Sequence, residues 1–339
     1  MTPRVTIVAG TGGVGKTTLS AALGTALADA GKRTLVVTVD PARRLADAMA
    51  VAPSLTPVAL RPDLVLWMPD ARSAFDAVID DCFPDPERFR HNPITETLRA
   101  APAGVHEAAV AMALAAVAPT FDEVVIDTAP SHHALDFLDT PGRLARLFER
   151  RSLQFFAAFG GLSTGLSAQA LIERAIGGVL PAAVIADGAR FFATTAEARQ
   201  PLARRARLAD ELLGSARFLI VSGTSAASVE GASHFHDVLR ERGSTAEATL
   251  MNRVPGDALR RAAARALSAL DADPAAGPEW RQAIAAIDAE ATRAAARRDH
   301  ALRRFPNALQ LPEVDAGAEL IAILAERLAP VAEGVALAG

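Results

Sequence analysis

The sequence predicts an α/β fold in which a doubly wound, mainly parallel sheet carries an inserted helical subdomain. Apolar runs of strand length alternate with helical stretches along most of the 339 residues. This order is typical of parallel strands joined by crossover helices. A glycine-rich turn at residues 10–15 separates the first apolar run from the first helical stretch. Between Gly142 and Gly214 the alternation stops, and no convincing strand occurs.

The expected strands are mostly apolar runs without alternation, as in strands that are covered on both faces. They are Val5–Ala9, Thr34–Val39, Val65–Met68, Glu123–Ile126, Phe218–Ser222, Glu247–Met251 and a short run, Ala308–Leu311. The expected helices are Lys16–Ala30, Arg43–Ala50, Ser73–Cys82, Val105–Ala118, Ala226–Arg242, Asp257–Leu270, Pro278–Arg304 and Asp315–Leu328. A nucleotide bound to such a sheet lies at the carboxyl ends of the strands.

We expect one domain over residues 1–335, with the helical subdomain inserted at residues 142–214. Residues 152–172 and 175–186 carry no formal charge. The first of these segments has the ~20 residues that a membrane span needs, but its polar residues and glycines make it a poor span. Two interpretations remain open: core helices that pack on the sheet, or an apolar groove for a partner or client protein.

The composition favours a cytoplasmic protein. The formal net charge of −4 argues against a general nucleic-acid surface. Cys82 is the one cysteine of the sequence, which excludes an internal disulfide or a zinc-binding pair of cysteines within one chain. A lone cysteine fits a reducing compartment, and the N-terminal residues lack a signal-peptide pattern.

Residues 10–18 read GTGGVGKTT, which has the spacing of a phosphate-binding loop between a strand and a helix. Backbone N–H groups in such a loop bind phosphate oxygens. The Lys16 ammonium can bind the terminal phosphates and the Thr17 hydroxyl can bind Mg²⁺. The sequence therefore predicts a P-loop NTPase whose nucleotide contacts include Gly12, Gly13, Val14, Gly15, Lys16, Thr17 and Thr18.

Two aspartates follow expected strands. Asp40 can orient or deprotonate the water that attacks the γ-phosphate; the alternative is a helix N-cap before Pro41. Asp127 ends the apolar run at 124–126 in the arrangement of a Walker B motif, so we expect it to hold Mg²⁺. The residues after Asp127 are expected to form a loop that senses the γ-phosphate. His132 and His133 lack further nearby ligands, and we expect them to be solvated residues of this loop rather than metal ligands.

Asn252 follows the expected strand Glu247–Met251, where its amide can read the edge of adenine. In isolation an asparagine there is more often a turn residue. Pro312 follows the last short strand and is either a loop stop or a wall of the base pocket.

These motifs together resemble the ArsA-like ATPases, which include arsenite-pump ATPases and ATPases that target tail-anchored proteins. The resemblance rests on residues 10–18, VDPARRLADAM at 39–49, DTAPSHHALDFL at 127–138, the triplet at 251–253, and Leu311-Pro312. It runs over nearly the whole chain, and bacterial relatives are the best match through residues 134–144.

The resemblance implies a dimeric ATPase that binds ATP and Mg²⁺ near the dimer interface. It assigns the catalytic switch aspartate to Asp40 and the Walker B role to Asp127. It places Asn252 on adenine, with Arg253 and Pro312 in the nucleotide site. It also implies that residues 142–214 form a groove for a hydrophobic protein client, so that nucleotide state drives protein targeting or a chaperone-like role. The alternatives are a ParA/MinD-like spatial organiser, or a weakly active subunit of a heterodimeric ATPase.

The sequence departs from the family pattern at Thr11, where the family has a lysine that reaches the nucleotide of the opposite subunit. Arg43 or Arg44 could replace this cation, or hydrolysis is slow. Our hypothesis is that the chain pairs with a paralogue that carries the lysine; a homodimer is the alternative. The zinc-binding cysteines of eukaryotic members and the arsenite-binding cysteines are missing, and the sequence has only 5 Met with which to build an adaptable hydrophobic groove.

Overall fold

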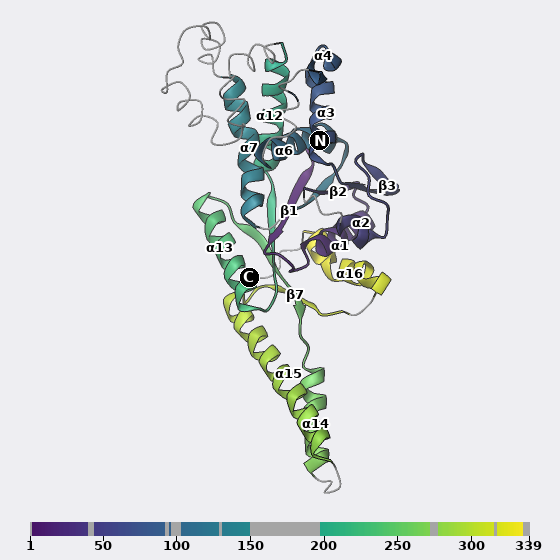
Figure 1. Cartoon of the computed structure of the whole chain (residues 1–339), viewed down its shortest axis with the longest axis vertical. Coiled ribbons are helices and arrows are strands. Elements are labelled where there is room, and N and C mark those ends of the chain that lie inside the picture. The colour runs from purple at the N-terminus through teal and green to yellow at the C-terminus, as the bar shows by residue number, and fades with distance from the viewer. Residues whose placement is uncertain are drawn as a thin grey trace. The chain divides into compact units, whose positions relative to one another are not determined.

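The computed structural model describes residues 2–39, 44–91, 95, 103–128, 131–149, 197–271, 277–314 and 317–334. Its strands form one sheet in the order β3-β4-β2-β5-β1-β6-β7-β8. Figure 1 labels β1, β2, β3 and β7 among these strands. The pairs β4–β2, β2–β5, β6–β7 and β7–β8 are parallel, and β3 pairs with β4 antiparallel. This mainly parallel sheet with its helices confirms the predicted α/β class.

The strands are β1 (Arg4–Gly10), β2 (Thr34–Thr38), β3 (Val58–Arg61), β4 (Leu64–Trp67), β5 (Glu123–Asp127), β6 (Arg217–Ser222), β7 (Ala246–Val254) and β8 (Leu309–Pro312). The α-helices are α1 (Lys16–Asp29), α2 (Arg44–Met49), α3 (Ala71–Cys82), α4 (Pro86–Arg90), α6 (Ala103–Val117), α7 (Ser131–Glu149), α12 (Arg199–Gly214), α13 (Ala226–Glu241), α14 (Ala258–Asp271), α15 (Pro278–Arg304) and α16 (Leu320–Ala332). Two short 3-10 helices are η1 (Ala118–Thr120) and η2 (Gly317–Glu319).

The chain divides into two compact units, and β1 contributes to both. The first unit comprises Met1–Ile7 and Leu27–Ala216, and the second comprises Val8–Ala26 and Arg217–Gly339. The phosphate-binding loop and Asn252 therefore belong to the second unit, whereas Asp127 belongs to the first.

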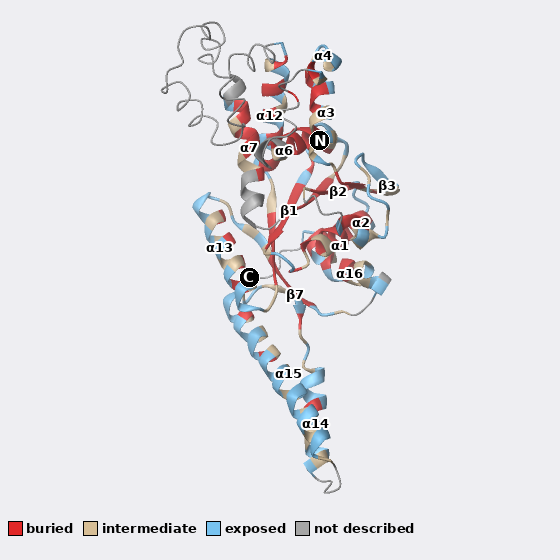
Figure 2. Ribbon diagram, in the orientation of Figure 1, coloured by how far each residue is buried: buried red, intermediate tan, exposed pale blue. Residues whose placement is uncertain are grey.

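In the first unit, β2 and β5 are buried along their whole length. Figure 2 shows β2 in the colour of buried residues. Helices α3, α6, α7 and α12 pack against one another. The middle of the bundle is α6, in which every residue from Ala108 to Ala115 is buried. A helix that is apolar on all sides belongs in the interior of a bundle.

In the second unit, α14 and α15 lie side by side. Buried or half-buried positions recur along α15 at spacings of three and four, the pattern of paired helices, at residues 281, 284, 288, 291, 295 and 298. Ion pairs lie at both ends of this helix pair, Arg281–Asp271 at 2.8 Å and Arg298–Asp257 at 3.1 Å.

Most expected elements occur within a few residues of their predicted bounds. The edge strand β3 and the short helix α4 are absent from the prediction. The expected loop beyond Asp127 is wrong from Ser131 onward, since α7 begins there and includes the backbone of His132 and His133. The last helix begins later than expected, at Leu320 instead of Asp315.

The predicted subdomain at 142–214 is only partly within the described residues. Its two ends lie in α7 and α12, and its described residues contain no strand. Residues 150–196 lie outside the described part, including the uncharged segments. Because α7 begins at Ser131 and continues past Gly142, the predicted start of the subdomain falls inside a helix. The division into one domain with this insertion remains a prediction.

Candidate functional site

The glycine-rich turn connects the end of β1 to the start of α1. Gly13 and Gly15 have φ values of +78° and +95°, which favour glycine because other residues are strained there. A Cβ at Gly10 would lie 2.3 Å from the Val221 carbonyl oxygen, so the end of β1 approaches the backbone of β6 closely. The three glycines at 10, 13 and 15 therefore meet steric requirements of the loop.

Lys16 is the first residue of α1, and its side chain turns back to the loop. Its Nζ donates to the Thr11 carbonyl oxygen at 3.0 Å, and the residue is 8% exposed. Thr17 and Thr18 follow in the first turn of α1 and are half-buried. The positive end of the helix dipole and a lysine thus lie at one loop, which fits a polyphosphate.

Asn252 lies in β7 and contacts the loop directly. Its Nδ2 donates to the Val14 carbonyl oxygen at 2.8 Å, and the residue is buried. The next residue, Arg253, is exposed and has a φ of +54°. Pro312 ends β8, where it is the register partner of Val254. The structure therefore brings Asn252 to the loop through a contact that the sequence analysis did not anticipate.

In the first unit, Asp127 ends β5 and is fully buried. Its carboxylate accepts a hydrogen bond from the Thr38 hydroxyl at 3.1 Å, and its carbonyl oxygen accepts from the Val39 N–H at 3.0 Å. These bonds fix the aspartate at the carboxyl end of its strand. Asp40 and Arg43 lie outside the described residues, and Arg44 is exposed at the start of α2.

A Mg²⁺ ion bound with nucleotide needs few protein ligands, because phosphates and water complete its octahedral shell. The Thr17 hydroxyl and the Asp127 carboxylate have suitable oxygen chemistry. Across the described parts of the chain, no three His, Cys, Asp or Glu side chains gather where they could hold a metal ion. The side chains of His132 and His133 are outside this description.

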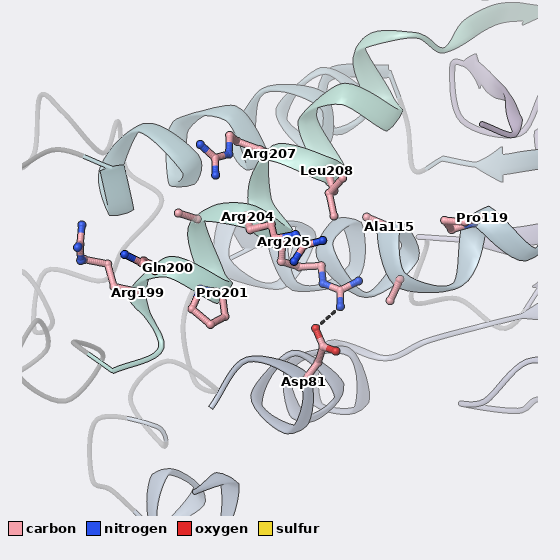
Figure 3. Close-up of a pocket in the computed structure, with 12 residues that line it drawn as sticks. Asp81, Ala115, Pro119, Arg199, Gln200, Pro201, Arg204, Arg205, Arg207 and Leu208 are labelled. Carbon is pink, nitrogen blue, oxygen red and sulfur yellow. Dashed lines mark hydrogen bonds and ion pairs between the residues drawn. The ribbon is translucent and has the colours of Figure 1, made fainter. Parts of the chain in front are cut away.

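A second polar site lies in the first unit, between α3, α6 with η1, and α12 (Figure 3). It is a cavity of about 960 Å³. Figure 3 shows Arg205 reaching Asp81, with which it forms an ion pair, and Arg204 beside it. The polar residues lining the cavity are Asp81, Arg199, Gln200, Arg204, Arg205 and Arg207. In the sequence, the signal for this site is the presence of four arginines between residues 199 and 207.

Cys82 lies next to this ion pair and is buried. Burial and the adjacent Asp81 carboxylate raise the pKa of its thiol to about 11. The thiol therefore stays protonated at neutral pH and is a weak nucleophile.

No helix in the stretches that the structure describes is both long enough and apolar enough to cross a lipid bilayer.

Comparison with known proteins gives the following matches. Residues 3–174 match the family model described as anion-transporting ATPase. An uncharacterised protein of Streptomyces coelicolor is 31% identical over 163 residues, or 43% of this chain and 39% of that protein. An arsenical pump-driving ATPase of Acidiphilium multivorum is 33% identical over 153 residues, or 41% of this chain and 26% of the relative.

ATPase ASNA1 homolog 1 of Paramecium tetraurelia is 30% identical over 175 residues, or 45% of this chain and 51% of the relative. In these three alignments the chain thus spans about half of the relative's length or less.

Proposed function

The chain belongs to the anion-transporting ATPase family, and from this premise we propose that it is a Mg²⁺-dependent ATPase that acts as a nucleotide-driven switch. The observation that carries the proposal is the loop between β1 and α1. It combines left-handed glycines at 13 and 15 with a buried lysine that is already hydrogen-bonded at the loop.

We propose that the phosphates bind to the backbone N–H groups of Gly12, Gly13, Val14 and Gly15 and to the first turn of α1. When nucleotide binds, the Lys16 ammonium exchanges the Thr11 carbonyl oxygen for oxygens of the terminal phosphates. A charged acceptor binds an ammonium more strongly than a neutral carbonyl does, so the exchange is favourable.

Thr17 and Asp127 are the proposed ligands of Mg²⁺, which when bound neutralises charge that develops on the phosphates. The Thr38 hydroxyl holds the Asp127 carboxylate in one orientation. Asp40 is the proposed group that orients the attacking water and accepts its proton. Asn252, Arg253 and Pro312 remain the proposed residues at the base side of the nucleotide.

The test is steady-state ATPase activity of the purified chain with Mg²⁺, for the native chain and for Asp40→Asn, with the mass measured with and without ATP. We expect ATP binding and slow hydrolysis by the native chain alone, and a loss of at least about 100-fold in kcat for Asp40→Asn with ATP binding retained. Absence of ATP binding by the native chain would contradict the proposal.

The family resemblance supports the further proposal that two subunits close around nucleotide. In this chain the Thr11 side chain lies against α13 of its own chain, since a Cβ at Gly231 would be 2.2 Å from the Thr11 Cγ2. We propose that a lysine-bearing paralogue supplies the missing cation. A homodimer served by Arg43 or Arg44 is the alternative.

We propose that the helical region of the first unit binds a partner protein that carries negative charge. The cavity supports this because it is lined by four arginines and one aspartate, beside apolar residues such as Ala115 and Leu208. Guanidinium groups bind carboxylates strongly.

A fluorescein-labelled peptide that alternates glutamate and leucine is a direct probe, compared with a lysine–leucine peptide of equal length. We expect Arg204→Ala/Arg207→Ala to weaken the acidic peptide's binding by about tenfold. Equal binding of both peptides would count against an acidic partner.

A further inference from the structure

We propose that Asn252 is also a positioning residue: it holds the phosphate-binding loop in shape, so that it controls affinity for the polyphosphate of any nucleotide. This inference rests on the proposed nucleotide binding at the same loop. It adds to the adenine-reading role that the family resemblance implies for Asn252.

The contact of Asn252 is with the loop backbone. Its Nδ2 donates to the Val14 carbonyl oxygen at 2.8 Å, and the bond joins residues that are 238 positions apart in the sequence. Asn252 is 6% exposed and Val14 is 5% exposed, so the bond is shielded from water. A hydrogen bond between buried groups is costly to break, because the acceptor is then left unsatisfied.

The same amide also limits the residue at position 15. A Cβ at Gly15 would lie 2.4 Å from the Asn252 Nδ2, and the φ of Gly15 is +95°. One side chain therefore touches two successive loop residues: it bonds to the carbonyl of the first and occupies the space beside the second. These are two of the residues whose N–H groups we expect to bind phosphate.

The backbone of β7 is irregular where it presents Asn252. Arg253 has a φ of +54°, and it is one of two non-glycine residues with positive φ in the described ranges. The register between β7 and β8 shifts between Met251 and Val254. A left-handed non-glycine residue costs about 1–2 kcal/mol. Such strain persists only where surrounding contacts determine the geometry, and here the neighbouring contact is the one to the loop.

The direction of the hydrogen bond explains why an amide is suitable at position 252. In a phosphate-binding loop the N–H groups turn toward the anion, and the carbonyl groups need donors elsewhere. The Asn252 amide is such a donor. Asp at this position would have the same shape but would offer only acceptors, and it would place a negative charge beside the anion site.

The experiment is calorimetric titration of the full chain with ATP, GTP and inorganic tripolyphosphate, each with Mg²⁺, well below the unfolding temperature. We expect Asn252→Ala to weaken tripolyphosphate binding by about tenfold and the binding of both nucleotides by at least as much, and Asn252→Asp to weaken all three more. Asn307→Ala, the same substitution at an exposed position, is the matched control and binds as the native chain does.

The inference is overturned if Asn252→Ala reduces the preference for ATP over GTP while tripolyphosphate binding stays within twofold of native. That result would assign Asn252 to the base. If the native chain binds none of the three ligands, the proposed function itself fails, which is a distinct outcome. Should Asn252→Ala not fold, Asn252→Ser, which keeps a shorter donor, takes its place in the same comparison.

Discussion

At the scale of single residues, the phosphate-binding loop shows what a local sequence pattern can predict and what it cannot. The spacing of glycines, lysine and threonine predicted the loop because all of its signals lie within nine residues. The bond from Asn252 to Val14 has no such signal, since the two residues are far apart in the sequence. Tertiary packing creates this contact, and no periodicity or spacing encodes it.

His236 on α13 provides a test at the same scale. It is half-buried, its Nε2 lies 2.9 Å from the Thr249 hydroxyl oxygen, and its ring stacks on Phe305. Burial, together with the positive charges of Arg240 and Arg304, lowers the pKa of His236 below 6.5, although Asp237 opposes the shift. The unfolded chain therefore takes up this proton at a higher pH than the folded chain does.

It follows that the contribution of His236 to stability is complete above pH 6.5 and is lost as the pH falls toward its folded pKa. We expect the urea concentration at the unfolding midpoint of the native chain to decrease when the pH is lowered from 7.5 to 5.5. In His236→Gln we expect a smaller decrease. His300→Gln, at an exposed position on α15, serves as the control. Equal falls in the native chain and in His236→Gln would show that another group is responsible.

At the scale of elements, the sequence predicted the helices and strands that have a clear hydrophobic pattern within their own residues. It missed β3, which is largely exposed at the edge of the sheet and is held by pairing with β4. It also placed the start of the inserted subdomain at Gly142. The structure instead has Pro141 and Gly142 buried inside α7, against which α12 packs.

Gly142 explains how α7 tolerates this sequence. A Cβ there would lie 2.4 Å from the Asp210 carboxylate oxygen of α12, so the two helices approach closely at a glycine. Packing of this kind can offset the ~3 kcal/mol that proline costs inside a helix. Propensity alone predicts a helix end at this point, and contact between helices overrides it.

The close approach of the end of β1 to β6 predicts the effect of a substitution at Gly10 on stability. Gly10→Ala would place a methyl group against the backbone of β6. A backbone carbonyl cannot rotate away from the methyl group as a side chain could. We expect a loss of about 1–3 kcal/mol in the free energy of unfolding.

Gly12→Ala is the matched control, because a Cβ there meets nothing within 4 Å. It should leave stability unchanged or raise it by up to about 1 kcal/mol. The free energies come from urea unfolding followed by circular dichroism. Equal stability of the two variants would refute the close approach of β1 to β6.

At the scale of the whole molecule, the fold class was predictable because the alternation of strands and helices is a property of the entire chain. The family match is more limited, since it covers residues 3–174. The arginine-lined cavity depends on three separate elements, α3, α6 with η1, and α12. A charge run on one helix does not reveal such a cavity.

The proposed pairing with a lysine-bearing partner subunit can be tested with mixed dimers. A Thr11→Lys/Lys16→Ala double variant carries the missing lysine but lacks the lysine of its own loop. Mixed with the native chain, it should raise ATP turnover at least about tenfold above the native chain alone, since a cation supplied in trans can be worth ~10³–10⁵ in rate.

Lys16→Ala mixed with the native chain is the control and should give no increase. The hypothesis of a lysine-bearing partner fails if mixed dimers form, as shown by native mass spectrometry, without an increase in turnover. It also fails if the native homodimer alone hydrolyses ATP briskly.

The acceptor for Lys16 is the backbone oxygen of residue 11, so this bond does not depend on which side chain residue 11 carries. A lineage can therefore exchange threonine and lysine there while the loop's own lysine keeps its partner. Some threonine and lysine codons differ by a single base. After a gene duplication, one mutation in one copy is enough to divide an ancestral pair of equal subunits into one that donates a lysine and one that receives it.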